Sequence, residues 1–157
     1  MNLQEELKAL KERIVELEEQ VEKEGGKEFP QDGDGYWYID TTGDVYDENW
    51  ECFSFEKATL EIGNVFKTKE QAEFAVEKLK VEAELRKFSR PIDYEDRNWA
   101  ILWDIDKKSI ETRYNYGMVR QGTIYFESKE KAQQAIEAVG EERIKKYIFG
   151  VEELNGN

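Results

Sequence analysis

The sequence predicts an α+β protein in which an N-terminal coiled-coil helix is followed by a duplicated antiparallel ββ(β)α module with a short C-terminal helix. Three observations predict this class: a heptad pattern near the N-terminus, two similar blocks sixty residues apart, and segments in which aromatic and polar residues alternate. We expect a dimerisation helix over 1–24, a flexible linker over 25–35 and a duplicated domain over 36–152. The two repeats of that domain are expected over 36–88 and 97–150.

The first helix carries apolar side chains at alternating spacings of four and three, namely Leu3, Leu7, Leu10, Ile14, Leu17 and Val21. This is a heptad pattern with Leu7, Ile14 and Val21 at position a and leucine at every position d. β-Branched residues at two of the three a positions, together with leucine at every d, favour two parallel helices. The sequence therefore predicts that the chain pairs with itself as a parallel coiled-coil dimer, and a higher oligomer stays open.

Charged residues beside this seam agree with a parallel dimer. Each g residue faces the e residue five positions on in the partner helix, which pairs Glu6 with Lys11 and Arg13 with Glu18. Both pairs are attractive. The alternative is an amphipathic helix that docks on its own domain, because three heptads are only marginally stable alone.

The helix is expected to end at the glycine pair of residues 25 and 26, and the segment GGKEFPQDGDG has the composition of a linker. Its aspartates suggest calcium, but an EF-hand loop needs glycine at its sixth position. Counting from Asp32 places Trp37 there, and counting from Asp40 places Val45. Turn chemistry accounts for these Asp and Gly residues, so no metal site is expected.

Two blocks of the remaining sequence match each other. FKTKEQA (66–72) corresponds to FESKEKA (126–132). Thr68 and Ser128 each stand where the N-cap of a helix is expected. Each copy is therefore predicted to contain two or three antiparallel strands followed by a helix.

The upstream part of each copy has the alternation of a strand, since Trp37 and Ile39 correspond to Trp99 and Ile101. In the second copy this alternation predicts one buried face, formed by Trp99, Ile101, Trp103 and Ile105. The further elements expected there are strands over 109–116 and 123–126, a loop over 117–122, and helices over 129–139 and 141–149.

The helix of the first copy is expected over 69–88 and has a second apolar stripe. The stripe consists of Phe74, Val81, Leu85 and Phe88. We expect it to pack against the other copy, and a subunit interface is the alternative.

Acidic residues concentrate in one segment. The formal net charge is −13, and residues 32–61 hold nine acids against one base, Lys57. A protein that binds duplex nucleic acid needs a basic stripe, and none is visible, so direct DNA binding is not expected. The acidic segment either keeps the protein in solution or imitates nucleic acid toward a basic partner.

The apolar runs are too short for a transmembrane helix or a signal peptide, so no membrane association is expected. The single cysteine, Cys52, excludes an internal disulfide framework and fits a reducing cytoplasm. We expect Cys52 to be a small buried residue, with a free reactive thiol as the alternative.

Catalysis has little support in the composition. The chain has no histidine and one cysteine, which removes the Cys-His, Ser-His-Asp and zinc constellations. No glycine-rich phosphate-binding motif occurs. We expect a binding protein without a cofactor, and a magnesium-dependent phosphodiesterase built on carboxylates alone stays open.

Two blocks, GNVFKTKEQAEFAVEKLKVEAELRK (63–87) and IYFESKEKAQQAIEAVGEERIKKYIFGVE (124–152), resemble a family of small proteins from phages and prophages of Gram-positive bacteria. The resemblance covers most of residues 36–152 and transfers no catalytic residue. It implies a setting in the cytoplasm of a bacterial host, among phage accessory proteins that often counter bacterial defence or adjust host machinery.

The first functional hypothesis is an oligomeric sponge that sequesters a small nucleotide immune signal. Aromatic rings can stack on a base while arginine holds phosphate. The candidate ligand-binding residues are Arg113 and Asn115 on a strand, Arg120 in the glycine-bracketed loop, and Tyr125. An ordinary surface or core role is the alternative for each.

The second hypothesis is an acidic inhibitor, a nucleic-acid mimic that blocks a nuclease or another basic host protein. Aromatic anchors within a charged rim suit such an interface. The residues concerned are Asp44, Asp47, Glu48, Glu51, Tyr36, Tyr38, Tyr46 and Trp50. A structural or assembly role in the phage particle is a third hypothesis. Dimerisation has an obvious use in shared ligand pockets and slightly favours the sponge.

Overall fold

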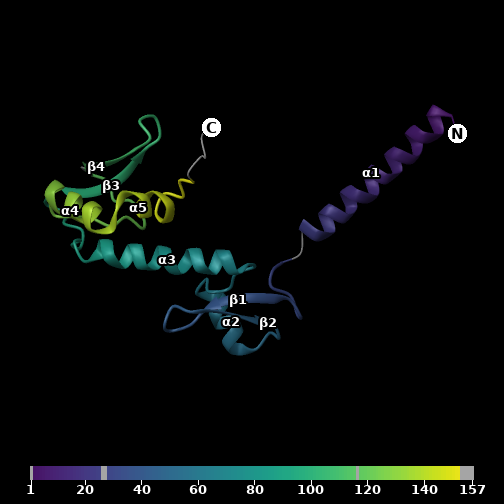
Figure 1. Cartoon of the computed structure of the whole chain (residues 1–157), viewed down its shortest axis with the longest axis horizontal. Helices are drawn as coiled ribbons and strands as arrows, with labels where there is room; N and C mark the ends of the chain where they lie inside the picture. Colours follow the sequence, from purple (N-terminus) through teal and green to yellow (C-terminus); the bar gives the residue numbers. More distant parts are fainter. Residues whose placement is uncertain (1, 26–27, 116, 153–157) are drawn as a thin grey trace. The chain divides into compact units, whose positions relative to one another are not determined.

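The computed structural model describes residues 2–25, 28–115 and 117–152. The described residues form a mixed α+β structure with a long N-terminal helix and two antiparallel sheets of two strands each (Figure 1). The chain divides into two compact units, Met1–Lys69 and Glu70–Asn157. The predicted α+β class is therefore confirmed at this level.

Helix α1 spans Leu3–Gly25, in agreement with the helix predicted over 1–24. Asn2 caps it, because its side-chain oxygen accepts hydrogen bonds from the Gln4 and Glu5 amides at 2.9 and 3.0 Å. The six heptad residues are all exposed, from 45% at Leu17 to 84% at Leu3. The helix therefore carries a continuous apolar stripe on its surface.

The first unit continues with a hairpin and a short helix: β1 (Gly35–Ile39), β2 (Val45–Asn49) and α2 (Ser54–Glu61). The register pairs Tyr36 with Glu48 and Tyr38 with Tyr46, so these four side chains share one face of the hairpin.

The turn between β1 and β2 is closed by Asp40. Its carboxylate accepts hydrogen bonds from the Thr42 amide and hydroxyl and from the Asp44 amide, at 2.8–2.9 Å. The hydrogen bond from the Thr42 hydroxyl contributes most to lowering the pKa of Asp40. The carboxylate is thus held ionised as part of an Asx-type turn.

A further segment joins the edge of the hairpin. Main-chain hydrogen bonds of 2.9 Å in both directions connect Trp37 with Phe66. The side-chain amide of Asn64 bonds both main-chain polar groups of Ile39, at 2.7 and 2.8 Å. The hairpin is therefore anchored on its β1 side by the residues that precede the next helix.

The elements of the second unit are α3 (Lys69–Arg86), which starts at the last residue of the first unit, β3 (Asn98–Asp104), β4 (Ser109–Asn115), α4 (Lys129–Val139) and α5 (Glu141–Tyr147). Main-chain hydrogen bonds of 3.0 and 2.8 Å connect Trp99 of β3 with Phe126, in the same arrangement as Trp37 with Phe66. A hairpin joined at its first strand to a phenylalanine just before a helix therefore occurs twice.

The core of the second unit is formed by Val81, Leu85, Phe126, Ala132, Ala135, Ile136, Val139 and Ile144. Phe88, Trp99 and Ile101 are partly buried against it. Three of the four residues of the second stripe of α3, Val81, Leu85 and Phe88, pack with residues of the segment expected as the second repeat, whereas Phe74 is 40% exposed.

The C-terminal helices agree with the prediction. The Ser128 hydroxyl accepts a hydrogen bond from the Lys131 amide at 3.1 Å, which caps α4, and Gly140 ends α4 with a φ of 97°. Helix α5 ends two residues before the predicted boundary at Phe149.

Four predictions of local structure were wrong. Residues 123–126 form a single bridge at Phe126 instead of a strand, and residues 54–61 form a helix that the repeat pattern did not indicate. Ile105 lies in the turn after β3 and is 80% exposed, and the buried residues of β3 are Asn98 and Ala100, on the face opposite the partly buried Trp99, Ile101 and Trp103. Cys52 is exposed as well, in the irregular segment between β2 and α2, where its φ is 63°.

Candidate functional site

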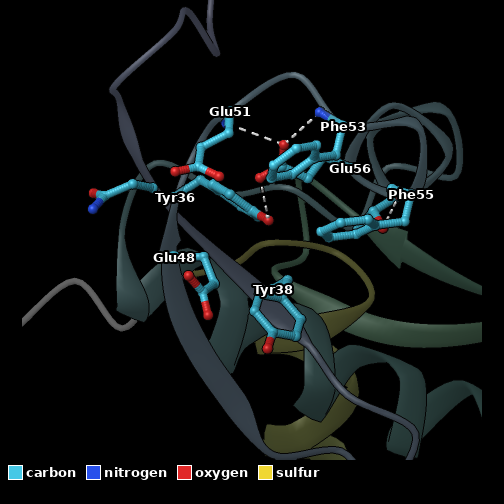
Figure 2. A pocket seen from close by; sticks show the side chains of 9 residues that line it. Tyr36, Tyr38, Glu48, Glu51, Phe53, Phe55 and Glu56 are labelled. Carbon is cyan, nitrogen blue, oxygen red and sulfur yellow. Dashed lines mark hydrogen bonds between the residues drawn. The ribbon is translucent and has the colours of Figure 1, made fainter.

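A cavity of about 390 Å³ lies in the first unit between the hairpin and the start of α2. Its lining is aromatic and acidic, with Tyr36, Tyr38, Glu48, Asn49, Glu51, Phe53, Phe55, Glu56 and Thr59. Figure 2 shows these side chains converging from β1, from β2 and from the segment that opens α2. We call this site the aromatic–acidic pocket.

A row of four rings runs along the hairpin and the residue after it, and two of them, Tyr36 and Tyr38, line the pocket. Tyr46, Tyr38, Tyr36 and Trp50 follow one another with ring centroids 6.1, 6.0 and 5.5 Å apart. Tyr36 and Trp50 are only 3% and 4% exposed, whereas Tyr46 is 49% exposed. The row therefore begins as core at Trp50 and becomes accessible surface toward Tyr46.

Glu56 is buried and connects the segments that form the pocket. Its carboxylate is 2% exposed and accepts three hydrogen bonds: from the Tyr36 hydroxyl at 3.1 Å, and from the Glu51 and Phe53 amides at 3.1 and 2.9 Å (Figure 2). The Phe53 amide is one of the unpaired N–H groups at the start of α2, so Glu56 caps this helix from its third position. One buried side chain thus holds β1, the preceding turn and α2 together.

Burial raises the pKa of Tyr36 to about 12, and the hydrogen bond to Glu56 and the charges of Glu56 and Glu48 add to this shift. The phenol is therefore a proton donor throughout the physiological range. Its role is to satisfy Glu56, which makes it structural and not a base.

Two phenylalanines form the accessible wall of the pocket. The rings of Phe53 and Phe55 stack with centroids 5.6 Å apart and an interplanar angle of 21°, and they are 50% and 64% exposed. They lie two positions apart at the start of a helix, so they cannot both point into a core beneath it. An exposed pair of rings of this kind is typical of a binding surface.

The charges at the pocket have one sign. Glu48 and Glu51 are exposed, and their carboxylates form no hydrogen bond or ion pair with the described residues. Among the described residues that line the pocket, none is Lys or Arg. Ring faces beside unpaired carboxylates can hold a cation such as an ammonium or guanidinium group.

Of the four residues predicted for a nucleotide site, the structure brings two together in one cavity. Arg120 and Tyr125 line one cavity of about 520 Å³ in the second unit, together with Arg86 and Arg90, which the sequence analysis missed. Arg113 is not among the residues that line this cavity, and its guanidinium pairs with Asp104 at 3.5 Å. We call this second site the arginine pocket.

Among the predicted ligand residues, Tyr125 offers no free side chain for a ligand. Tyr125 is 6% exposed and its hydroxyl accepts a hydrogen bond from the Arg120 amide at 2.9 Å, so its ring is core and not a free stacking platform. The side chain of Asn115 lies outside the described residues.

The aromatic anchors predicted for a protein interface are also only partly right. Tyr36 and Trp50 are buried and serve the core, whereas Tyr38 and Tyr46 retain accessible surface. The sequence analysis did not identify Phe53 and Phe55, which line the pocket at the start of α2.

In comparisons with known proteins, no protein-family model, curated protein or solved structure matches this chain. The described residues contain no group of three or more acidic or cysteine side chains arranged to hold a metal ion. None of the helices in the described part of the chain combines the length and apolarity needed to cross a bilayer.

Proposed function

We propose that this chain is a non-enzymatic binding protein that docks on a basic surface of a partner protein through the aromatic–acidic pocket. The observation that carries this proposal is the pairing of two exposed, stacked phenylalanines with unpaired carboxylates in one pocket. This is the acidic-inhibitor hypothesis of the sequence analysis, with Phe53 and Phe55 as its anchors.

The proposed contact is a Lys or Arg side chain of the partner inserted between ring and carboxylate. A cation over an aromatic face contributes about 0.5–2 kcal/mol, depending on how far it is desolvated. Glu48 and Glu51 add charge-assisted hydrogen bonds, and the other acids of residues 32–61 increase the association rate. The aromatic wall supplies apolar contact, which distinguishes docking from attraction to net charge alone.

We propose further that α1 pairs with α1 of a second copy of the chain, so that the dimer carries two aromatic–acidic pockets. The exposed seam of α1 and the predicted pairs of Glu6 with Lys11 and of Arg13 with Glu18 fit a second copy of the same helix. Within one chain Arg13 already pairs with Glu16 at 3.0 Å, and this exposed pair is weak enough to exchange. A dimer presents two pockets at once, which increases the overall affinity for a partner with two basic sites.

The repeated connection of Trp37 with Phe66 and of Trp99 with Phe126 supports the proposal that the two hairpin-plus-helix modules arose by duplication. The resemblance to phage proteins supports a setting in which the partner is a basic host protein, such as a nuclease of a defence system. A nucleotide-binding function is the second candidate, and the arginine pocket favours it.

The docking proposal is tested by calorimetric titration of the full chain with a peptide rich in lysine and arginine. Phe55→Ala is expected to weaken binding about two- to thirtyfold, the range of a cation–π contact. Ile62→Ala is the matched control, because Ile62 is 79% exposed in the same unit and does not line the pocket. Equal effects of the two substitutions contradict the proposal.

The carboxylates are tested in the same titration with Glu48→Gln and, as control, Glu61→Gln. Both variants remove one negative charge from the first unit, but only Glu48 lines the pocket. A larger loss for Glu48→Gln supports a located contact, whereas equal losses indicate general attraction to an acidic surface.

The dimer is tested by light scattering after deletion of residues 1–24, which should lower the mass to that of a monomer. Glu6→Lys should weaken association at low salt, and Lys11→Glu in the same chain should partly restore it, by about 0.2–1 kcal/mol for such an exposed pair. An unchanged mass after the deletion contradicts the dimer.

A further inference from the structure

We propose that the arginine pocket of the second unit binds a small molecule carrying two or more phosphate charges. This inference concerns a different unit from the aromatic–acidic pocket and does not rest on the function proposed for that site. In this form of the nucleotide hypothesis, Arg86, Arg90 and Arg120 are the residues that surround the phosphates.

The charge of the pocket is opposite to that of the chain. Three arginines and, among its described lining residues, no acid surround a cavity of about 520 Å³ in a protein whose net charge is −13. Arg86 and Arg90 pair with acids that do not line the cavity, Glu82 at 3.4 Å and Asp93 at 3.1 Å, so Arg120 is the lining arginine without an ion pair among the described residues. A concave surface lined by one sign of charge concentrates ligands of the other sign.

Arg120 supplies a charge that the described protein does not neutralise. Its side chain forms no ion pair with the described residues, and only its main-chain amide is engaged, by the Tyr125 hydroxyl. Arg86 pairs with Glu82 at 3.4 Å, but its side chain is 57% exposed, so this ion pair is weak. Both guanidinium groups can therefore turn to an incoming phosphate.

Arg90 is fixed in place and has one donor left over. Its Nη1 donates to Asp93 at 3.1 Å and its Nη2 to the main-chain oxygen of Arg97 at 2.7 Å, while Asp96 lies 3.9 Å away. Its Nε is buried and has no hydrogen-bond partner among the described residues. A buried donor without an acceptor is unfavourable, and a ligand oxygen can satisfy it only once the atoms that cover Nε have moved aside.

The remaining lining suits an organic group attached to the phosphates. Pro91, Ile92, Val119 and Ile124 give the pocket an apolar side, and its volume lies within the usual range for small-molecule sites. Ser89 and Thr123 add hydroxyls. A nucleotide has both parts, phosphates for the arginines and a base for the apolar side.

The test is calorimetric titration of the full chain with three probes: inorganic pyrophosphate, ADP and adenosine. We expect pyrophosphate and ADP to bind and adenosine to give no heat. Tighter binding of ADP than of pyrophosphate assigns a nucleotide, and equal binding assigns the phosphates alone; both support the inference. Absence of pyrophosphate and ADP binding up to millimolar concentrations overturns it.

Variants locate the site. Arg120→Gln and Arg86→Gln are each expected to weaken pyrophosphate binding about tenfold, the loss of one charge-assisted hydrogen bond. Arg113→Gln is the matched control, because Arg113 is an exposed arginine of the same unit outside the pocket. Arg90 is left unchanged, since it also holds the residues around Asp93. If Arg113→Gln weakens binding as much as Arg120→Gln, the inference is wrong.

Discussion

Replacing Glu56 with alanine tests whether one buried carboxylate holds the aromatic–acidic pocket together. The substitution removes the acceptor for the Tyr36 hydroxyl and for the Glu51 and Phe53 amides. It leaves the hairpin and the apolar contacts of α2 in place. Any loss of stability therefore reports on the three hydrogen bonds.

The expected cost follows from the number of donors left without a partner. The Tyr36 hydroxyl is buried and the Glu51 and Phe53 amides are part-buried, so each donor left without a partner costs at most about 1–3 kcal/mol, and removal of the buried charge returns part of that sum. Glu56→Ala should thus lower the free energy of unfolding of the first unit by about 3–5 kcal/mol. Glu56→Gln should cost about 1–2 kcal/mol, because its amide oxygen can still accept from the two main-chain amides while its nitrogen faces the Tyr36 hydroxyl.

Amide hydrogen exchange followed by NMR measures this loss locally, since it separates the first unit from the second. Exchange at Glu51 and Phe53 should accelerate in Glu56→Ala and much less in Glu56→Gln. Glu61→Ala, an exposed substitution in the same helix, should stay within about 0.5 kcal/mol of the parent chain. Exchange in Glu56→Ala that matches the parent chain would refute the argument, as would equal losses for alanine and glutamine.

Three further predictions concern pH and packing. Because the folded pKa of Tyr36 is about 12 against an ordinary 10.0, the free energy of unfolding should fall as pH rises between these values, and Tyr36→Phe should remove that fall in alkaline denaturation curves. Hydrogen bonds from Arg143 lower the pKa of Glu84. The stability that they contribute should therefore be present at pH values above the ordinary carboxyl pKa and be lost on acidification. Glu84→Gln should flatten the acid limb of a plot of melting temperature against pH. Leu85→Ala should lower the free energy of unfolding of the second unit by about 2–5 kcal/mol in urea titrations, whereas Leu79→Ala, which alters a 56% exposed residue of the same helix, should change it little.

The sequence predicts well those elements whose ends are determined by residues close to them in the chain. Ser128 and Gly140 delimit α4, and the heptad pattern delimits α1, because caps and periodicity act within a few residues. Helix α2 carries no such signal. Its first amide is capped by Glu56 from inside the helix, and Phe53 at the N-cap position is not a residue that marks a helix start.

The candidate sites depend on contacts between distant residues, which composition does not reveal. Tyr36 and Trp50 are buried while Phe53 and Phe55 are accessible, although all four are aromatic and lie within twenty residues of one another. The arginine pocket brings Arg86 of α3 beside Arg120, although more than thirty residues separate them in the sequence. Sequence reasoning identified Arg120 from its glycine-bracketed loop and had no means of finding its neighbours.

The central claim is that the first unit binds a cationic side chain in the aromatic–acidic pocket, and an NMR titration of the full chain with N-acetyl-arginine methylamide tests it most directly. The account predicts that the largest amide shifts occur at Tyr38, Glu48, Phe53 and Phe55, and that Phe55→Ala reduces them while Ile62→Ala does not. Shifts that follow the acidic residues throughout the chain, α1 included, without a maximum at the pocket would contradict it.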